Sequence, residues 1–108
     1  MRLRLHRQRR VDTRGLKPFE RAVLRFNTSD ARRKVEGLSR TLGEATVSVG
    51  AAAGAAEEIR ITVAWELTWY QWAVASGERE RPIAELAHGT ELDQLDASAR
   101  QWNATWRS

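Results

Sequence analysis

The sequence predicts an α+β fold, with an antiparallel sheet of three to four strands packed against two or three helices. Apolar residues recur at helical spacing in residues 15–43 and again near residue 100, and β-branched and aromatic residues alternate from residue 59 onward. The expected order is strand, one or two helices, three strands and a final helix. The 108 residues include no cysteine and suffice for a single domain, residues 1–108, with a core that needs no disulfide.

The first eleven residues are expected to form either a short edge strand or a flexible basic arm. Leu3 and Leu5 alternate with arginines, as in a strand with one apolar face. The segment then runs into Arg9 and Arg10, which favours a solvated arm.

Residues 15–43 are expected to form two helical pieces, either one kinked helix or a tight helical pair. Pro18 suits a first turn, where its missing N–H costs no hydrogen bond. Two apolar stripes follow at helical spacing: Phe19, Ala22, Val23 and Phe26, then Ala31, Val35, Leu38 and Leu42. Residues 27–30 combine helix-stop and N-cap chemistry, and Gly43 suits the position after a helix.

Two strands are expected on either side of the Ala/Gly-rich segment 50–56, at residues 44–49 and from Ile59. Alternation from Ile59 to Trp69 predicts one long strand with Trp65, Leu67 and Trp69 on the face beneath the helices. After Trp69 the pattern changes face, which indicates a one-residue register slip such as a β-bulge. Trp72 is therefore expected on the opposite, uncovered face.

The same tryptophans allow a different interpretation. Trp65, Trp69 and Trp72 have the i, i+4, i+7 spacing of a helix that would run from Ala64 to Gly77. The strand is favoured, because no proline, glycine or capping residue breaks the chain before Ala64.

Residues 82–89 fit either a helical turn or a return strand, and the strand is preferred because a charged turn precedes them. Residues 90–93 resemble a capping box. The apolar residues that follow are spaced by 3, 4, 3 and 4, which predicts one C-terminal helix, with a shorter helix capped by Asp96 as the alternative. These residues are Leu92, Leu95, Ala99, Trp102 and Trp106.

Charge is divided unevenly along the chain. Residues 1–40 hold thirteen Lys and Arg against four acids, for a net of +9, whereas residues 41–108 hold five against ten, for a net of −5. The basic half is expected either to face an anionic partner or to complement the acidic half. Arginine outnumbers lysine sixteen to two, which suggests a GC-rich, bacterial genome.

No motif in the sequence predicts catalysis, and we expect a non-enzymatic protein without metal or cofactor. His6 and His88 are far apart and have no neighbouring ligand, whereas zinc needs three or four. The glycines of residues 50–54 lack the lysine of a phosphate-binding loop. Glu66, expected mid-strand, would merit attention as a buried carboxylate, but an exposed position opposite an arginine is the plainer interpretation.

Tryptophan content favours a protein-interaction or homo-oligomerising module, with a homodimer as the expected form. The contact residues are expected on the uncovered sheet face, Tyr70 and Trp72, or on the terminal helix, Trp102 and Trp106. We expect a cytoplasmic protein with no membrane partner, because cysteine is absent and no apolar run has the length of a spanning helix.

Nucleic-acid binding by the basic half is the alternative function, because clustered arginines neutralise phosphates and exposed tryptophans stack on bases. Against it, basic and aromatic residues are not interleaved. The candidate residues are Arg7, Arg9, Arg10, Arg32, Arg33 and Lys34.

Overall fold

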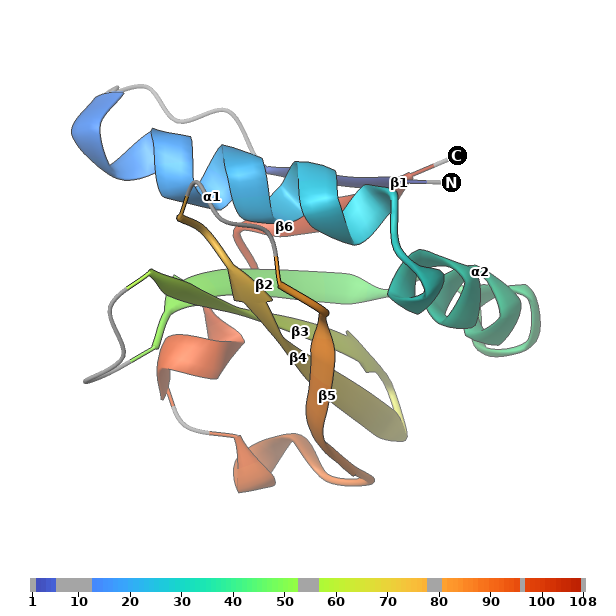
Figure 1. Cartoon of the computed structure of the whole chain (residues 1–108). Helices are drawn as coiled ribbons and strands as arrows, with labels where there is room; N and C mark the ends of the chain where they lie inside the picture. The colour runs from blue at the N-terminus through green and yellow to red at the C-terminus, as the bar shows by residue number, and fades with distance from the viewer. Residues whose placement is uncertain (1, 6–12, 53–56, 78–80, 96, 108) are drawn as a thin grey trace.

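A six-stranded antiparallel sheet organises the described part of the chain (Figure 1). The structure, a computed structural model, describes residues 2–5, 13–52, 57–77, 81–95 and 97–107. The elements in chain order are β1 (Arg2–Leu5), α1 (Thr13–Asn27), α2 (Asp30–Leu42), β2 (Thr46–Ala51), β3 (Glu58–Trp65), β4 (Thr68–Ala75), β5 (Ala84–Gly89), the 3-10 turns η1 (Leu92–Gln94) and η2 (Ala97–Arg100), and β6 (Ala104–Arg107). The strand order across the sheet is β1-β6-β2-β3-β4-β5. The predicted α+β class is confirmed, with more strands than expected.

The two helices are a tight pair, and both place most of their predicted apolar stripes toward the sheet, but Leu42, expected to continue the second stripe, is 44% exposed. Phe26 in α1 and Val35 in α2 are fully buried. Gly43 ends α2 with φ +90°, a backbone conformation that residues with a Cβ rarely adopt, and its N–H donates to the Ser39 carbonyl at 3.0 Å. One expectation is wrong: α1 begins at Thr13, so Pro18 lies inside the helix and not in its first turn.

The segment expected to be one long strand is the β3–β4 hairpin. Trp65 pairs with Thr68, which leaves Glu66 and Leu67 as a two-residue turn. The change of face after Trp69 therefore arises from this turn and not from a slip at Tyr70. Leu67, expected in the core, is 76% exposed at the turn. The helical alternative is also wrong.

The hairpin places Trp69 and Trp72 on the faces opposite to those predicted, whereas Trp65 lies on the core face as expected. Trp65 and Trp72 lie with Phe26 in the main core between the sheet and α1. Trp69 lies on the other face, where it packs with Leu95 and its Nε1 donates to the Glu91 carbonyl at 2.9 Å. The 3-10 turns thus cover part of the sheet face that the helices leave open.

The predicted C-terminal helix is wrong. Residues after η2 form β6, which lies between β1 and β2 and pairs Trp106 with Leu3 and Thr105 with Thr46. Trp106 consequently joins the main core, 6.4 Å from Phe26 between ring centroids. Backbone hydrogen bonds to two neighbouring strands explain why the local helical spacing does not decide the structure here.

The outer strands of the sheet are protected in different ways. The Asn27 side chain accepts from the Leu3 N–H at 2.7 Å and donates to the Leu3 carbonyl at 3.1 Å, so an amide from α1 occupies the backbone groups of Leu3 in edge strand β1. The Asn103 side chain likewise accepts from the Val49 N–H at 2.7 Å and donates to the Val49 carbonyl at 2.8 Å. These bonds lie beyond the point where β6 pairs with β2. At the other edge, β5 confirms the strand expected in residues 82–89 and contains an irregularity at Leu86. A bulge and charged residues on an edge disfavour pairing with another strand.

Candidate binding groove

The residues expected to form a contact surface are mostly covered by this chain. Trp72 is 3% exposed and Trp106 is 7% exposed, so the expectation that Trp72 lies on an uncovered face is wrong. The β3–β4 turn brings Trp72 to the helix side of the sheet, and Phe26 covers it. Tyr70 and Trp102 are half-buried. Two of the four predicted contact residues therefore lie inside the fold.

The predicted nucleic-acid residues are divided among several environments. Arg7, Arg9 and Arg10 lie outside the described residues. On α2, Arg32 bonds Glu36 at 3.2 Å, and Lys34 bonds Glu85 on β5 at 2.5 Å, whereas Arg33 is exposed and has no ion pair within the part of the chain that the structure describes. These ion pairs were not predicted individually, but Lys34–Glu85 links the basic half to the acidic half.

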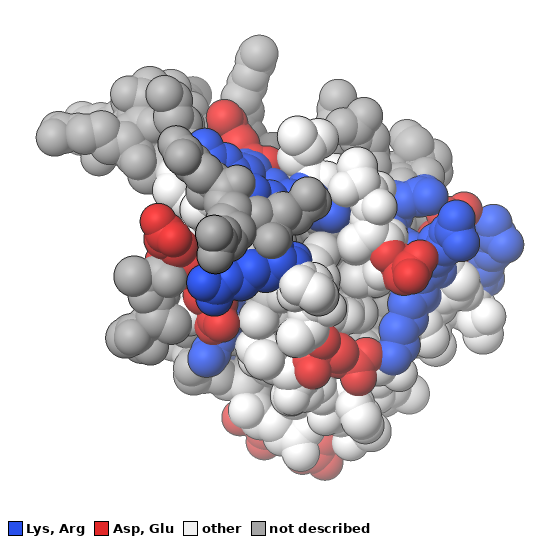
Figure 2. Space-filling view, in the orientation of Figure 1, with Lys and Arg blue, Asp and Glu red and all other residues white. Residues whose placement is uncertain are grey.

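A groove lies where the α1–α2 turn faces the chain that enters β5. It consists of two hollows with volumes of about 410 and 560 Å³. Both hollows are lined by Thr28 and Ser29 from the turn and by Pro82 and Ile83 before β5, so they adjoin. Figure 2 views this side of the molecule and shows a largely uncharged central area with both basic and acidic side chains around it.

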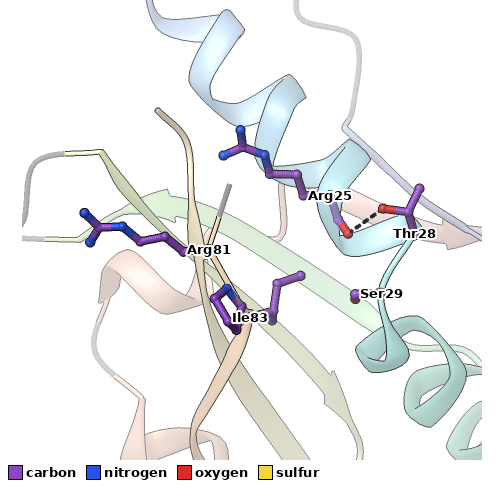
Figure 3. A pocket seen from close by; sticks show the side chains of 6 residues that line it. Arg25, Thr28, Ser29, Arg81 and Ile83 are labelled. Atoms are coloured by element: carbon purple, nitrogen blue, oxygen red, sulfur yellow. Dashed lines mark hydrogen bonds between the residues drawn. The ribbon is translucent and has the colours of Figure 1, made fainter. Parts of the chain in front are cut away.

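The smaller hollow is lined by two arginines. Arg25 comes from α1 and Arg81 from the segment before β5, and both side chains extend away from Ser29 (Figure 3). Arg25 donates to the Ala75 carbonyl at 2.5 Å, which anchors its guanidinium to the end of β4. Arg81 is exposed and makes no hydrogen bond or ion pair with any residue of the described ranges.

The larger hollow is lined by apolar groups, including Trp72, Pro82 and Ile83, and by one basic and two acidic side chains, Lys34, Asp30 and Glu85; Tyr70 and His88 lie beside its lining. The Lys34 ammonium lies 4.5 Å from the centre of the Tyr70 ring, and Tyr70 stacks on Trp72 with centroids 5.9 Å apart. Glu85 bonds Lys34 and lies 3.8 Å from His88 Nδ1. The arrangement gives a partly apolar floor beside a partly exposed ion pair, which suits a ligand with both apolar and charged groups.

Other chemistry is not assembled in the described parts of the chain. No three His, Cys, Asp or Glu side chains gather there as a metal ion would require. Glu66 is exposed in the β3–β4 turn and not mid-strand as expected. Among the described residues, no helix has both the length and the apolar character needed to cross a membrane.

No protein family, curated protein or solved structure matches this chain.

The groove is not predicted by the sequence, although four of its residues belong to segments with a recognisable local role. Thr28 and Ser29 were identified only as helix-stop and capping residues, and Arg81 and Pro82 only as a turn before a strand. Residues so distant in sequence give no local sign that they will face one another, because the strand order that brings them together is non-local.

Proposed function

We propose that this chain is a non-enzymatic protein-interaction domain that binds a segment of a partner protein in the groove between the α1–α2 turn and β5. The observation that carries the proposal is the pair of adjoining hollows, which together form a concave surface with a partly apolar floor and charged walls. Concave sites with a few placed polar groups are where proteins usually bind ligands. We propose a cytoplasmic setting, in keeping with the absence of cysteine.

Because both edges of the sheet are protected, we propose that the partner binds in the groove and does not add a strand to the sheet. β1 has its Leu3 backbone groups occupied by the Asn27 amide, and β5 is short and irregular at Leu86. A partner strand that extended the sheet would have to displace the Asn27 amide from β1 or accommodate the irregularity of β5.

The test uses one variant that fills the groove and one that does not. Thr28 is exposed and lines both hollows, so Thr28→Trp should obstruct the groove without disturbing the core. Leu24 is exposed on α1 and lines neither hollow, so Leu24→Trp is the matched control. Short random peptides displayed on phage are selected on the native domain, and the selected peptides are synthesised and titrated by fluorescence anisotropy.

We expect Thr28→Trp to weaken these peptides at least about tenfold, a loss of roughly 1.4 kcal/mol, and Leu24→Trp to leave their affinity unchanged. Equal binding to both variants, or no selectable peptide, would contradict the proposal. Sedimentation velocity on the same three proteins examines the homodimer: a dimer that Thr28→Trp dissociates would identify a second copy as the occupant of the groove.

Nucleic-acid binding is the second candidate, favoured by the exposed Arg33 and Arg81. A filter-binding titration of single- and double-stranded oligonucleotides across salt concentrations tests it, because the logarithm of the affinity falls with the logarithm of the salt concentration by about 0.7–0.9 for each phosphate contacted. Absence of salt-dependent binding would exclude this function.

A further inference from the structure

The solvent-facing side of α2 carries a glycine between two basic residues. Arg33, Gly37 and Arg40 are exposed and recur at helical spacing on the side opposite the buried Val35. A Cβ added at Gly37 would meet no atom within 4 Å, so crowding within the chain does not explain a glycine there. Glycine also weakens a helix interior relative to alanine. The outer face of α2, defined by these three exposed residues, therefore presents open backbone between two guanidiniums.

The basic charges of this face exceed the acidic charges that pair with them in the described residues. Arg33 forms no ion pair there. Arg40, whose side chain is 74% exposed, bonds Glu36 at 3.0 Å, but the same carboxylate also bonds Arg32 at 3.2 Å. One glutamate thus serves two guanidiniums, and exposed ion pairs of this kind are weak. A carboxylate from outside the chain can therefore bind to this face.

The β3–β4 turn has the opposite charge and an exposed apolar side chain. Leu67 is 76% exposed at the turn, beside the exposed Glu66. Trp65 Nε1 donates to the Gly43 carbonyl at 3.1 Å, which holds the end of α2 and the exposed Glu44 close to the turn (Figure 1). Neither Glu44 nor Glu66 forms an ion pair with another residue of the described ranges. Glu44, Glu66 and Leu67 together form the turn surface.

The turn surface and the outer face of α2 complement each other. Carboxylates and guanidiniums form charge-assisted hydrogen bonds, which are stronger than hydrogen bonds between neutral groups. Leu67 can bury its side chain against the open backbone at Gly37, where no side chain obstructs it. Within one chain the two surfaces point in different directions, because α2 turns Val35 toward the core and its arginines to solvent. A contact between them therefore requires a second copy of the chain.

We propose that the chain forms a two-fold dimer in which the turn surface of each copy packs on the outer face of α2 of the other. Because the Trp65–Gly43 hydrogen bond keeps both surfaces at one end of the molecule, a single two-fold axis makes the contact twice. None of the residues of the two surfaces lines either hollow of the groove, so this contact is separate from the proposed function. The surfaces are small, so we expect a weak dimer, with a Kd above about 10 µM, and a monomer in dilute solution.

Sedimentation equilibrium over a wide range of protein concentrations, at low and high salt, measures this association. Arg33→Glu and Glu66→Arg each place like charges at the contact, so each variant alone should associate at least about tenfold more weakly than the native chain. An equimolar mixture of the two variants should regain most of the native affinity, because both contacts of the mixed dimer then join opposite charges. High salt should weaken the native dimer.

Two further variants test the apolar part of the contact. Gly37→Gln should weaken the dimer while raising the urea midpoint of the dilute monomer, because glutamine is the better helix former. Leu67→Ser should weaken the dimer and leave that midpoint nearly unchanged. Leu24→Ser is the matched control, because it removes an exposed leucine from α1 and should leave the association unchanged.

Several results would overturn the inference: monomers at every concentration, equal association of Leu67→Ser and Leu24→Ser, or a mixture that associates no more tightly than either charge variant alone. Assemblies larger than a dimer would overturn the two-fold arrangement. A dimer that Thr28→Trp dissociates and Leu67→Ser does not would place the second copy in the groove and also overturn it. If the chain dimerises as expected but no peptide is selected, the proposed function alone fails.

Discussion

Replacing Trp72 by alanine should strongly destabilise the fold and not merely alter a surface. The ring is 3% exposed and meets Phe26 edge-on at 5.3 Å and Tyr70 in a stack at 5.9 Å. Removal of a buried tryptophan costs about 3–5 kcal/mol in free energy of unfolding, including the cavity that remains. Native domains have about 5–15 kcal/mol in total, so the loss is a large fraction of the stability.

Urea denaturation followed by far-UV circular dichroism measures this loss, with Trp72→Phe as the control that keeps an aromatic ring in the core. We expect the control to lose clearly less stability than the alanine variant. The measurement is repeated over a range of protein concentrations, since a dimer contact would make the midpoint depend on concentration.

A core position for Trp72 would be contradicted by a loss below about 1 kcal/mol in the alanine variant together with conversion of a native dimer into a folded monomer. That result would place Trp72 at a subunit contact, as the sequence alone suggests, and not in the core beneath α1.

Three further changes probe separate features of the fold, each by urea denaturation. Asn27→Asp replaces the Nδ2 donor to the Leu3 carbonyl with an oxygen, so we expect a loss of about 1–3 kcal/mol; an unchanged midpoint would show that the amide does not hold β1. Gly89→Ala would place a Cβ 2.7 Å from the Trp69 ring, so we expect about 1–3 kcal/mol of destabilisation and an altered near-UV spectrum. An unchanged free energy of unfolding would mean that the ring can move away from the added methyl group. Leu67→Ser changes an exposed turn residue, so stability should stay within about 0.5 kcal/mol, and a larger loss would indicate that this side chain is covered.

Local patterns predicted the helices well, because a helix is stabilised by contacts between residues three and four apart. Phe26 and Val35 are buried and Gly43 ends α2 as expected, although Leu42 at the end of the second stripe is exposed. Return strand β5 was also predicted, from the charged turn before it. In each case the decisive signal lies within a few residues of the element itself.

The β3–β4 hairpin could not be recognised from its turn. Two-residue hairpin turns are usually marked by glycine, asparagine or aspartate, which tolerate positive φ. Glu66 and Leu67 carry no such mark, and neither has positive φ. The turn is nevertheless visible in the sequence pattern, because the residues of the apolar face change from odd to even positions between Trp65 and Tyr70.

The C-terminal segment shows why a regular apolar spacing can mislead. Leu95 and Ala99 pack on one face of the sheet and Trp106 on the other, so residues that suggest one helical stripe belong to two separate cores. The groove was beyond sequence reasoning for a related reason: Arg25 and Arg81 line one hollow only because the sheet and helices bring their elements together.

The amide contacts of Asn27 and Asn103 have a consequence for the choice of expression host. Each asparagine begins an Asn-x-Ser/Thr triplet, the acceptor motif for N-linked sugars in secretory compartments. The sugar would attach to Nδ2, the atom that donates to the Leu3 carbonyl in one case and to the Val49 carbonyl in the other. Glycan transfer before folding would therefore compete directly with closure of the sheet, and production of this chain through a eukaryotic secretory route should yield misfolded protein even though both triplets look like ordinary acceptors.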